Sequence, residues 1–188
     1  RIAQSRGITR AIGEEHPGRF LLQNLVGGGS TNTMTDGTNS TILGGLSNIH
    51  TAGSQNLIGG GASNTITAGN HTTILGGASN SQTDGSYNLI GGGQTNSIVS
   101  GTHNAVVSGQ SNVITGGNQN AITGGEDNTI TTGNKGAITG GQFNEITAGN
   151  NNSILGGESN TTCTATSGNI CDSCCSQSKI TCTCSLNG

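Results

Sequence analysis

The sequence predicts an all-β protein: a parallel β-solenoid or β-roll with coils of 16 residues and two short strands in each coil. Three observations predict this fold. A short motif repeats at constant spacing, isoleucine or valine recurs at matched positions, and glycine follows each of them within three residues. We divide the chain into an N-terminal cap or junction at 1–22, the solenoid at 23–160 and a Cys-rich C-terminal cap at 161–188.

The composition suits a repeat array better than a globular domain. The 188 residues include 35 Gly, one Tyr, two Phe and no Trp, and only 8% are charged. So few aromatic side chains could not fill a broad core, whereas a solenoid needs only a thin core because each coil buries its apolar residues against the next. The net charge of −3 argues against a nucleic-acid partner, and no apolar run is long enough for direct membrane insertion.

The first segment interrupts the repeat pattern. Gly7, Gly13 and Pro17 separate loosely spaced apolar residues. Because the end of a solenoid needs covering, we expect a cap or a junction to an upstream stalk here.

Each predicted coil consists of a nine-residue half and a seven-residue half. Eight full copies extend from Gln23 to Asn150, and a ninth half-copy extends from Asn151 to Ser159. Each half carries one inward β-branched position, as at Ile58 in the longer half and Ile66 in the shorter one. Parallel stacking at about 4.8 Å would give a rod about 40 Å long.

The shorter half begins with asparagine in every copy. This residue lies two positions before the inward isoleucine and should therefore be on the same side of the strand. We expect an Asn ladder whose amides bond the coils above and below and satisfy the turn backbone; sugar binding by these amides is the alternative. The residues are Asn32, Asn48, Asn64, Asn80, Asn96, Asn112, Asn128, Asn144 and Asn160.

The outer face of the shorter strand carries a row of threonines, interrupted by Val99. Such a row suits a solvated sheet face, and it is also the feature on which an ice-binding alternative rests. The surface Thr ladder consists of Thr35, Thr51, Thr67, Thr83, Thr115, Thr131 and Thr147.

The outer face of the longer strand carries an apolar stripe. Leucine alternates between the two outward positions on successive coils, opposite a smaller residue, so this face repeats every 32 residues. Large and small residues that complement one another are typical of an interdigitating contact; an exposed, mildly apolar face is the alternative. We predict an oligomer interface formed by Leu25, Leu43, Leu57, Leu75, Leu89, Val107 and Leu155.

All six cysteines follow the repeats, within 161–188. Their spacing fits poorly with the repeated C-x2-C pairs of zinc sites and predicts a disulfide-stapled cap in an oxidising, extracellular setting. The pairing, within or between chains, stays open. The candidate disulfide residues are Cys163, Cys171, Cys174, Cys175, Cys182 and Cys184.

The segment Asn152-Ser153-Ile154-Leu155-Gly156, with the next half starting at Asn160, resembles the head repeat of trimeric autotransporter adhesins. Similar Asn/Gly/Ile repeats occur in fibres of phages and large viruses. The adhesin resemblance implies a left-handed, homotrimeric β-roll whose outer surface binds a host-cell receptor, matrix protein or glycan. The coil here is longer than the usual head coil, and no coiled-coil stalk or membrane barrel is visible.

No pattern in the sequence predicts catalysis or metal binding. We assign His50, His71 and His103 to unrelated repeat positions, and the acidic pairs have no partners on long loops. We therefore expect no enzyme activity, metal or cofactor. The leading hypothesis is a structural or adhesive fibre segment on a cell or virion surface. Ice binding is the alternative, and a glycan-processing β-helix enzyme is a remote one.

Overall fold

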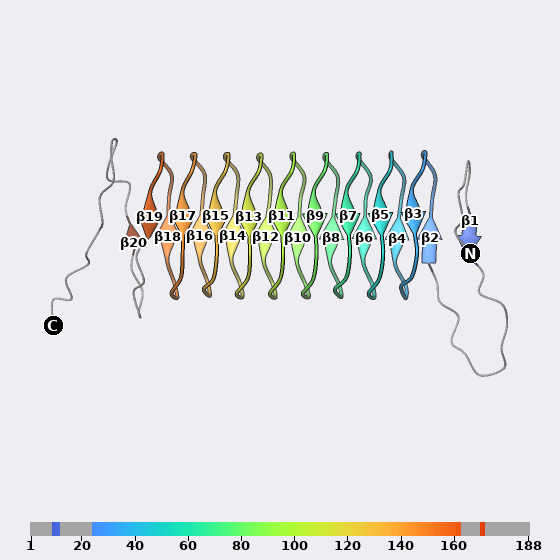
Figure 1. Cartoon of the computed structure of the whole chain (residues 1–188), viewed down its shortest axis with the longest axis horizontal. Helices are drawn as coiled ribbons and strands as arrows, with labels where there is room; N and C mark the ends of the chain where they lie inside the picture. Colours follow the sequence, from blue (N-terminus) through green and yellow to red (C-terminus); the bar gives the residue numbers. More distant parts are fainter. Residues whose placement is uncertain (1–8, 12–23, 163–169, 172–188) are drawn as a thin grey trace.

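The computed structural model describes residues 9–11, 24–162 and 170–171, and in these residues every regular element is a strand. The strands form two sheets that face each other across a thin core. Figure 1 shows the coils stacked along one axis, with turns along two opposite edges. The predicted parallel β-solenoid with 16-residue coils and two short strands per coil is confirmed.

The first sheet has 11 strands. They are β1 (Thr9–Ala11), β2 (Asn24–Val26), β4 (Thr41–Ile42), β6 (Leu57–Ile58), β8 (Thr73–Ile74), β10 (Leu89–Ile90), β12 (Ala105–Val106), β14 (Ala121–Ile122), β16 (Ala137–Ile138), β18 (Ser153–Ile154) and β20 (Ile170–Cys171). All neighbours are parallel except β1 and β2.

The second sheet has nine strands, all parallel. They are β3 (Thr33–Met34), β5 (Ile49–His50), β7 (Thr65–Ile66), β9 (Ser81–Gln82), β11 (Ser97–Ile98), β13 (Val113–Ile114), β15 (Thr129–Ile130), β17 (Glu145–Ile146) and β19 (Thr161–Thr162). Because β19 and β20 continue the two sheets, strand pairing extends past the expected end of the solenoid at residue 160.

The halves of each coil are equal in length, which corrects the predicted division into nine and seven residues. β3, β4 and β5 begin at Thr33, Thr41 and Ile49, so one half-coil takes eight residues. Each half reads Asn-x-Ile-x-x-Gly-x-x, and we number these positions 1 to 8. The unequal division arises when the two halves are counted from different starting residues.

The core is a double column of the residues at position 3. From β4 to β19 their side chains lie inward and are buried, with Ile42, Ile58 and Ile74 at 0% exposure in the first sheet, whereas Met34 in β3 is half-buried. Ile66, Ile98 and the later isoleucines of the second sheet pack against them. Every strand is short because the chain turns at the glycine three residues after this inward position.

Turns at two corners join the sheets. Position 7 of each turn forms an isolated parallel bridge to the next coil, from Ser30 through to Glu158 at the first corner and from Thr38 through to Asn150 at the second. Position 6 is glycine with positive φ, and position 8 is a non-glycine residue with φ between 52 and 59°. At position 8 the backbone N–H donates to the preceding coil, as from Ser79 to the Ala62 carbonyl at 2.8 Å. Hydrogen bonds therefore offset the strain of each turn.

Candidate functional site

The predicted Asn ladder lies inside the first corner, next to the second sheet. Asn80 shows the geometry: its backbone N–H donates to Asn64 Oδ1 at 3.0 Å, and its Oδ1 accepts from the Asn96 N–H at 2.9 Å. Its Nδ2 donates to the carbonyls of Gly76 at 3.0 Å and Gly93 at 3.1 Å. The side chain is buried and both polar atoms of its amide have partners within the protein, so the ladder is structural and does not present its amides to a sugar.

A second amide ladder, absent from the sequence-based prediction, lies inside the second corner, next to the first sheet. Asn104 donates its N–H to Asn88 Oδ1 at 2.9 Å and its Nδ2 to the Gly117 carbonyl at 3.0 Å. The eight-residue spacing of asparagines would have revealed it. The members are Asn24, Asn56, Asn88, Asn104, Asn120 and Asn152, with Ser40, Thr72 and Gly136 at three positions.

The predicted oligomer-interface residues all lie on the outer face of the first sheet. Leu43, Leu75, Val107 and Leu155, at position 4 of their coils, are exposed by 47–55%. Leu25, at position 2, is exposed by 37%, and Leu57 and Leu89 are half-buried. The structure therefore places an apolar stripe on one face, and nothing among the described residues covers it.

Glycine alternates with these leucines at position 4 for a reason internal to the chain. A Cβ on Gly27, Gly59 or Gly91 would lie 2.4–2.6 Å from a backbone carbonyl oxygen in the next coil. In these three coils the backbone therefore fits closely around a residue without a Cβ, whereas the same position accepts Leu43, Leu75 and Val107 in other coils.

Position 5 of the first sheet is glycine in every described coil but one, and for most of these glycines the stack imposes no such requirement. A Cβ on Gly28, Gly76, Gly92, Gly140 or Gly156 would meet no atom within 4 Å. Ser108 occupies the exceptional coil, and the corresponding positions of the second sheet include Asp36, Ala52 and Thr132. We call this column of position-5 residues the shoulder of the first sheet. The shoulder thus carries almost no side chains, although most of its glycines have space for a Cβ.

The predicted Thr ladder lies on the outer face of the second sheet. Thr35, Thr67, Thr83, Thr115 and Thr147 are exposed, and Thr51 and Thr131 are half-buried. Strand partners are 16 residues apart throughout this sheet, so the hydroxyl rows are regular. Ile49 and Val99, with exposures of 39% and 37%, and the charged Glu145 interrupt this face.

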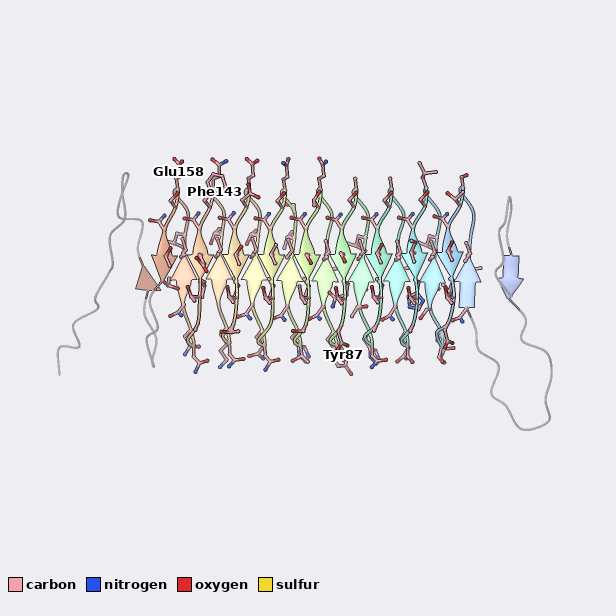
Figure 2. The ribbon with its side chains drawn as sticks, in the orientation of Figure 1. Tyr87, Phe143 and Glu158 are labelled. Atoms are coloured by element: carbon pink, nitrogen blue, oxygen red, sulfur yellow. The ribbon has the colours of Figure 1, made fainter. Side chains whose placement is uncertain are left out.

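The assignment of the histidines to unrelated positions was wrong for two of them. His71 and His103 both occupy position 8 of the second corner, with Tyr87 between them. The ring centroids are 4.6 Å and 4.9 Å apart, with nearly parallel planes. Figure 2 shows Tyr87 on the edge of the rod opposite Phe143 and Glu158. Each ring face of Tyr87 is covered by an imidazole, so this exposed column is already self-stacked.

Three polar side chains replace isoleucine in the core column of the second sheet, namely His50, Gln82 and, in the last coil, Thr162. His50 and Gln82 are each 1% exposed and lie on either side of Ile66 in the column. Asn56 Nδ2 lies 3.0 Å from His50 Nε2, whereas His50 Nδ1 and Gln82 Oε1 have no hydrogen-bond partner. Burial lowers the pKa of His50, and the backbone and charge of Asp36 offset part of this effect. The N-terminal coils therefore contain a polar defect.

Most of the candidate disulfide residues lie outside the described residues. Cys171 is in β20, and the predicted pairing stays a prediction. Among the residues with a described position, no cluster of three or more His, Cys, Asp or Glu side chains could hold a metal ion. None of the described segments is a helix that could cross a membrane.

Comparison with known proteins did not place the chain in a family. No protein-family model matches the sequence, and no curated protein matches it.

Proposed function

We propose that the chain is a rigid, non-catalytic structural segment of a fibre on a cell or virion surface, in an extracellular setting. One observation supports this most strongly: each described coil is hydrogen-bonded to the next through both strands and both corners, in one repeating register. A β-solenoid of this kind forms a rod along its whole length, because each coil is held by its neighbours.

The exposed stripe of the first sheet supports self-association as part of this function. An apolar stripe of this length on a rod is typical of a surface that another chain covers. The corner residues, among them Tyr87 and Phe143, provide varied side chains along the edges for attachment to a receptor, matrix protein or glycan.

Electron microscopy and small-angle scattering of the full chain in reducing buffer test the structural part. We expect straight rods at least about 40 Å long and a circular dichroism spectrum of β-structure. A chain with a random-coil spectrum and no rods would refute the proposal. Saturable binding of rods to arrayed matrix proteins and glycans tests attachment, and its absence would restrict the function to a scaffold.

Ice binding is the second candidate, because the Thr rows of the second sheet are regular and largely uncharged. Ile49, Val99 and Glu145 interrupt this face, which makes it the weaker candidate. Thermal hysteresis and faceted ice crystals at micromolar protein would support it, with Thr67→Tyr/Thr115→Tyr abolishing both effects. Their absence in the unmodified chain would eliminate it.

A further inference from the structure

We propose that the first sheet binds a second copy of the chain face to face, with the two rods parallel and related by a two-fold axis that runs along the rod. This inference rests on the proposed function, because it names the partner in the self-association described there. In this pairing, each coil contacts the equivalent coil of the second copy.

The outward residues of the first sheet form two columns, one on each side of the buried isoleucine column. Positions 2 and 4 of one coil lie side by side on the outer face, because successive side chains of a strand alternate between faces. In β2 to β12 each coil pairs a larger residue with a smaller one. The pairs are Leu25 with Gly27, Thr41 with Leu43, Leu57 with Gly59, Thr73 with Leu75, Leu89 with Gly91 and Ala105 with Val107.

A two-fold axis along the rod places position 2 of one copy over position 4 of the other. It does not shift the coils of one copy along the rod relative to those of the other. Leu57 of one chain then lies over Gly59 of the second copy, and Thr73 lies over Leu75. Every leucine from β2 to β10 meets a smaller residue, and the same contacts occur twice by symmetry. The alternation of large and small residues thus makes the face complementary to itself.

Other arrangements match the face less well. Antiparallel rods in full overlap would place the Leu-containing coils of β4 and β6 over the Ala- and Thr-rich coils of β16 and β14. A three-fold assembly needs two different surfaces from each chain, and only one sheet face of the described coils carries the stripe. The parallel pair instead brings the Leu-rich coils of the two copies together from β2 to β10.

The area of the face reaches the lower limit for a specific pair. The strands from β2 to β18, stacked at about 4.8 Å, give a length of about 43 Å, and positions 2 to 5 at about 3.3 Å per residue give a width of about 13 Å. Two such faces bury roughly 1,100 Å², above the ~1,000 Å² expected of a specific interface. The bare shoulder at Gly28, Gly60 and Gly76 lies beside the leucines and offers no side chain that would hold a second sheet away.

Sedimentation velocity of the full chain in reducing buffer tests the pairing. We expect a two-chain mass at protein concentrations in the tens of micromolar. Thr73→Leu places two leucines on one coil, so the larger side chain introduced in one copy collides with Leu75 of the other. Dimer affinity should then fall at least about tenfold, although the face becomes more apolar. Thr73→Leu/Leu75→Ala restores one large and one small residue and should recover most of the affinity.

Thr65→Leu, at the same coil position in the second sheet, is the matched control and should leave affinity unchanged. If the copies associated through non-specific hydrophobic contacts, Thr73→Leu would instead associate more tightly. That result, a monomer or a three-chain mass would refute the pairing. A monomeric rod would overturn this inference and the self-association but leave the rigid rod of the proposed function, whereas loss of the rod would overturn the proposed function itself.

Spin labels carried by a ketone amino acid test the parallel orientation without using cysteine. Gln55, Gln119 and Asn151 share position 8 of the second corner, where the chain already accepts Tyr87. The two-fold axis requires the same distance between equivalent labels at all three sites. Distances that differ among the three sites indicate antiparallel rods and refute the orientation.

Discussion

Asn64 Oδ1 accepts a hydrogen bond of 3.0 Å from the backbone N–H of Asn80, one coil further along the chain. Asn80 repeats the contact with Asn96 at 2.9 Å. The Oδ1 of each asparagine thus accepts the backbone N–H of the next asparagine in the ladder, for which the corner supplies no backbone acceptor. These side-chain acceptors stabilise the corners, because buried N–H groups that lack an acceptor are costly.

Asn80→Ala tests this relationship. It leaves the buried N–H of Asn96 without an acceptor and opens a cavity, so we expect the free energy of unfolding to fall by about 3 kcal/mol. Urea unfolding and amide hydrogen exchange measure it. Asn70→Ala is the control: its exposed Oδ1 accepts from the Ser54 N–H at 3.1 Å, and the change should cost less than about 1 kcal/mol. Equal losses would contradict the structural role of the ladder.

Two adjacent glycines should respond oppositely to the same substitution. Gly77 has φ of +85°, and a Cβ there would lie 2.2 Å from the Gly93 carbonyl oxygen. Gly77→Ala should destabilise the fold by about 4 kcal/mol. Gly76 has open space at the Cβ position, so Gly76→Ala should be neutral or stabilise by up to about 1 kcal/mol. Thermal unfolding at low protein concentration measures both, and similar effects would be inconsistent with this geometry.

His50 makes stability depend on pH. Burial lowers its pKa in the folded chain, so below about pH 6.5 the unfolded chain takes up a proton that the folded chain excludes. Stability should therefore be greatest above this pH and fall as the solution is acidified. His50→Ile should raise stability, because it removes a buried unpartnered Nδ1, and should flatten the pH dependence of the N-terminal coils. Hydrogen exchange of β3 to β7 between about pH 5 and 8 measures both effects.

The control for that experiment is His71→Gln, which alters a histidine on the exposed column of the second corner. It should leave the pH dependence of β3 to β7 in place. If His71→Gln removed it and His50→Ile did not, the assignment of the effect to the core histidine would be wrong.

Tyr87 is the only tyrosine in the chain, which has no tryptophan, so its fluorescence reports on the second corner. His71→Ala/His103→Ala uncovers both faces of its ring and should increase quenching by acrylamide. Asn39→Ala is the control, because Asn39 occupies the same position of the same corner but lies in a coil farther from the tyrosine. No change in quenching in the double variant would show that the stacked column does not form in solution.

Much of the fold could be predicted because the sequence itself repeats with a fixed period. The inward isoleucines, the coil length and the two strands per coil follow from spacing alone, since each coil repeats the same local choices. The second Asn ladder could also have been found, but Ser40, Thr72 and Gly136 interrupt it. The equal halves could also have been found, because the inward residues recur every eight positions, but the two halves were counted from different starting residues.

The sequence by itself determined the periodic roles: isoleucine inside, glycine at the turns and asparagine at the corners. Only the tertiary structure decided which contacts these residues make between neighbouring coils. It showed that a Cβ on Gly59 would lie 2.4 Å from the carbonyl oxygen of Leu75, whereas a Cβ on Gly76 would meet no atom within 4 Å. It also brought His71, Tyr87 and His103 into one stack. The reason is physical: such contacts join residues 16 or more positions apart, and their distances depend on how closely the coils stack.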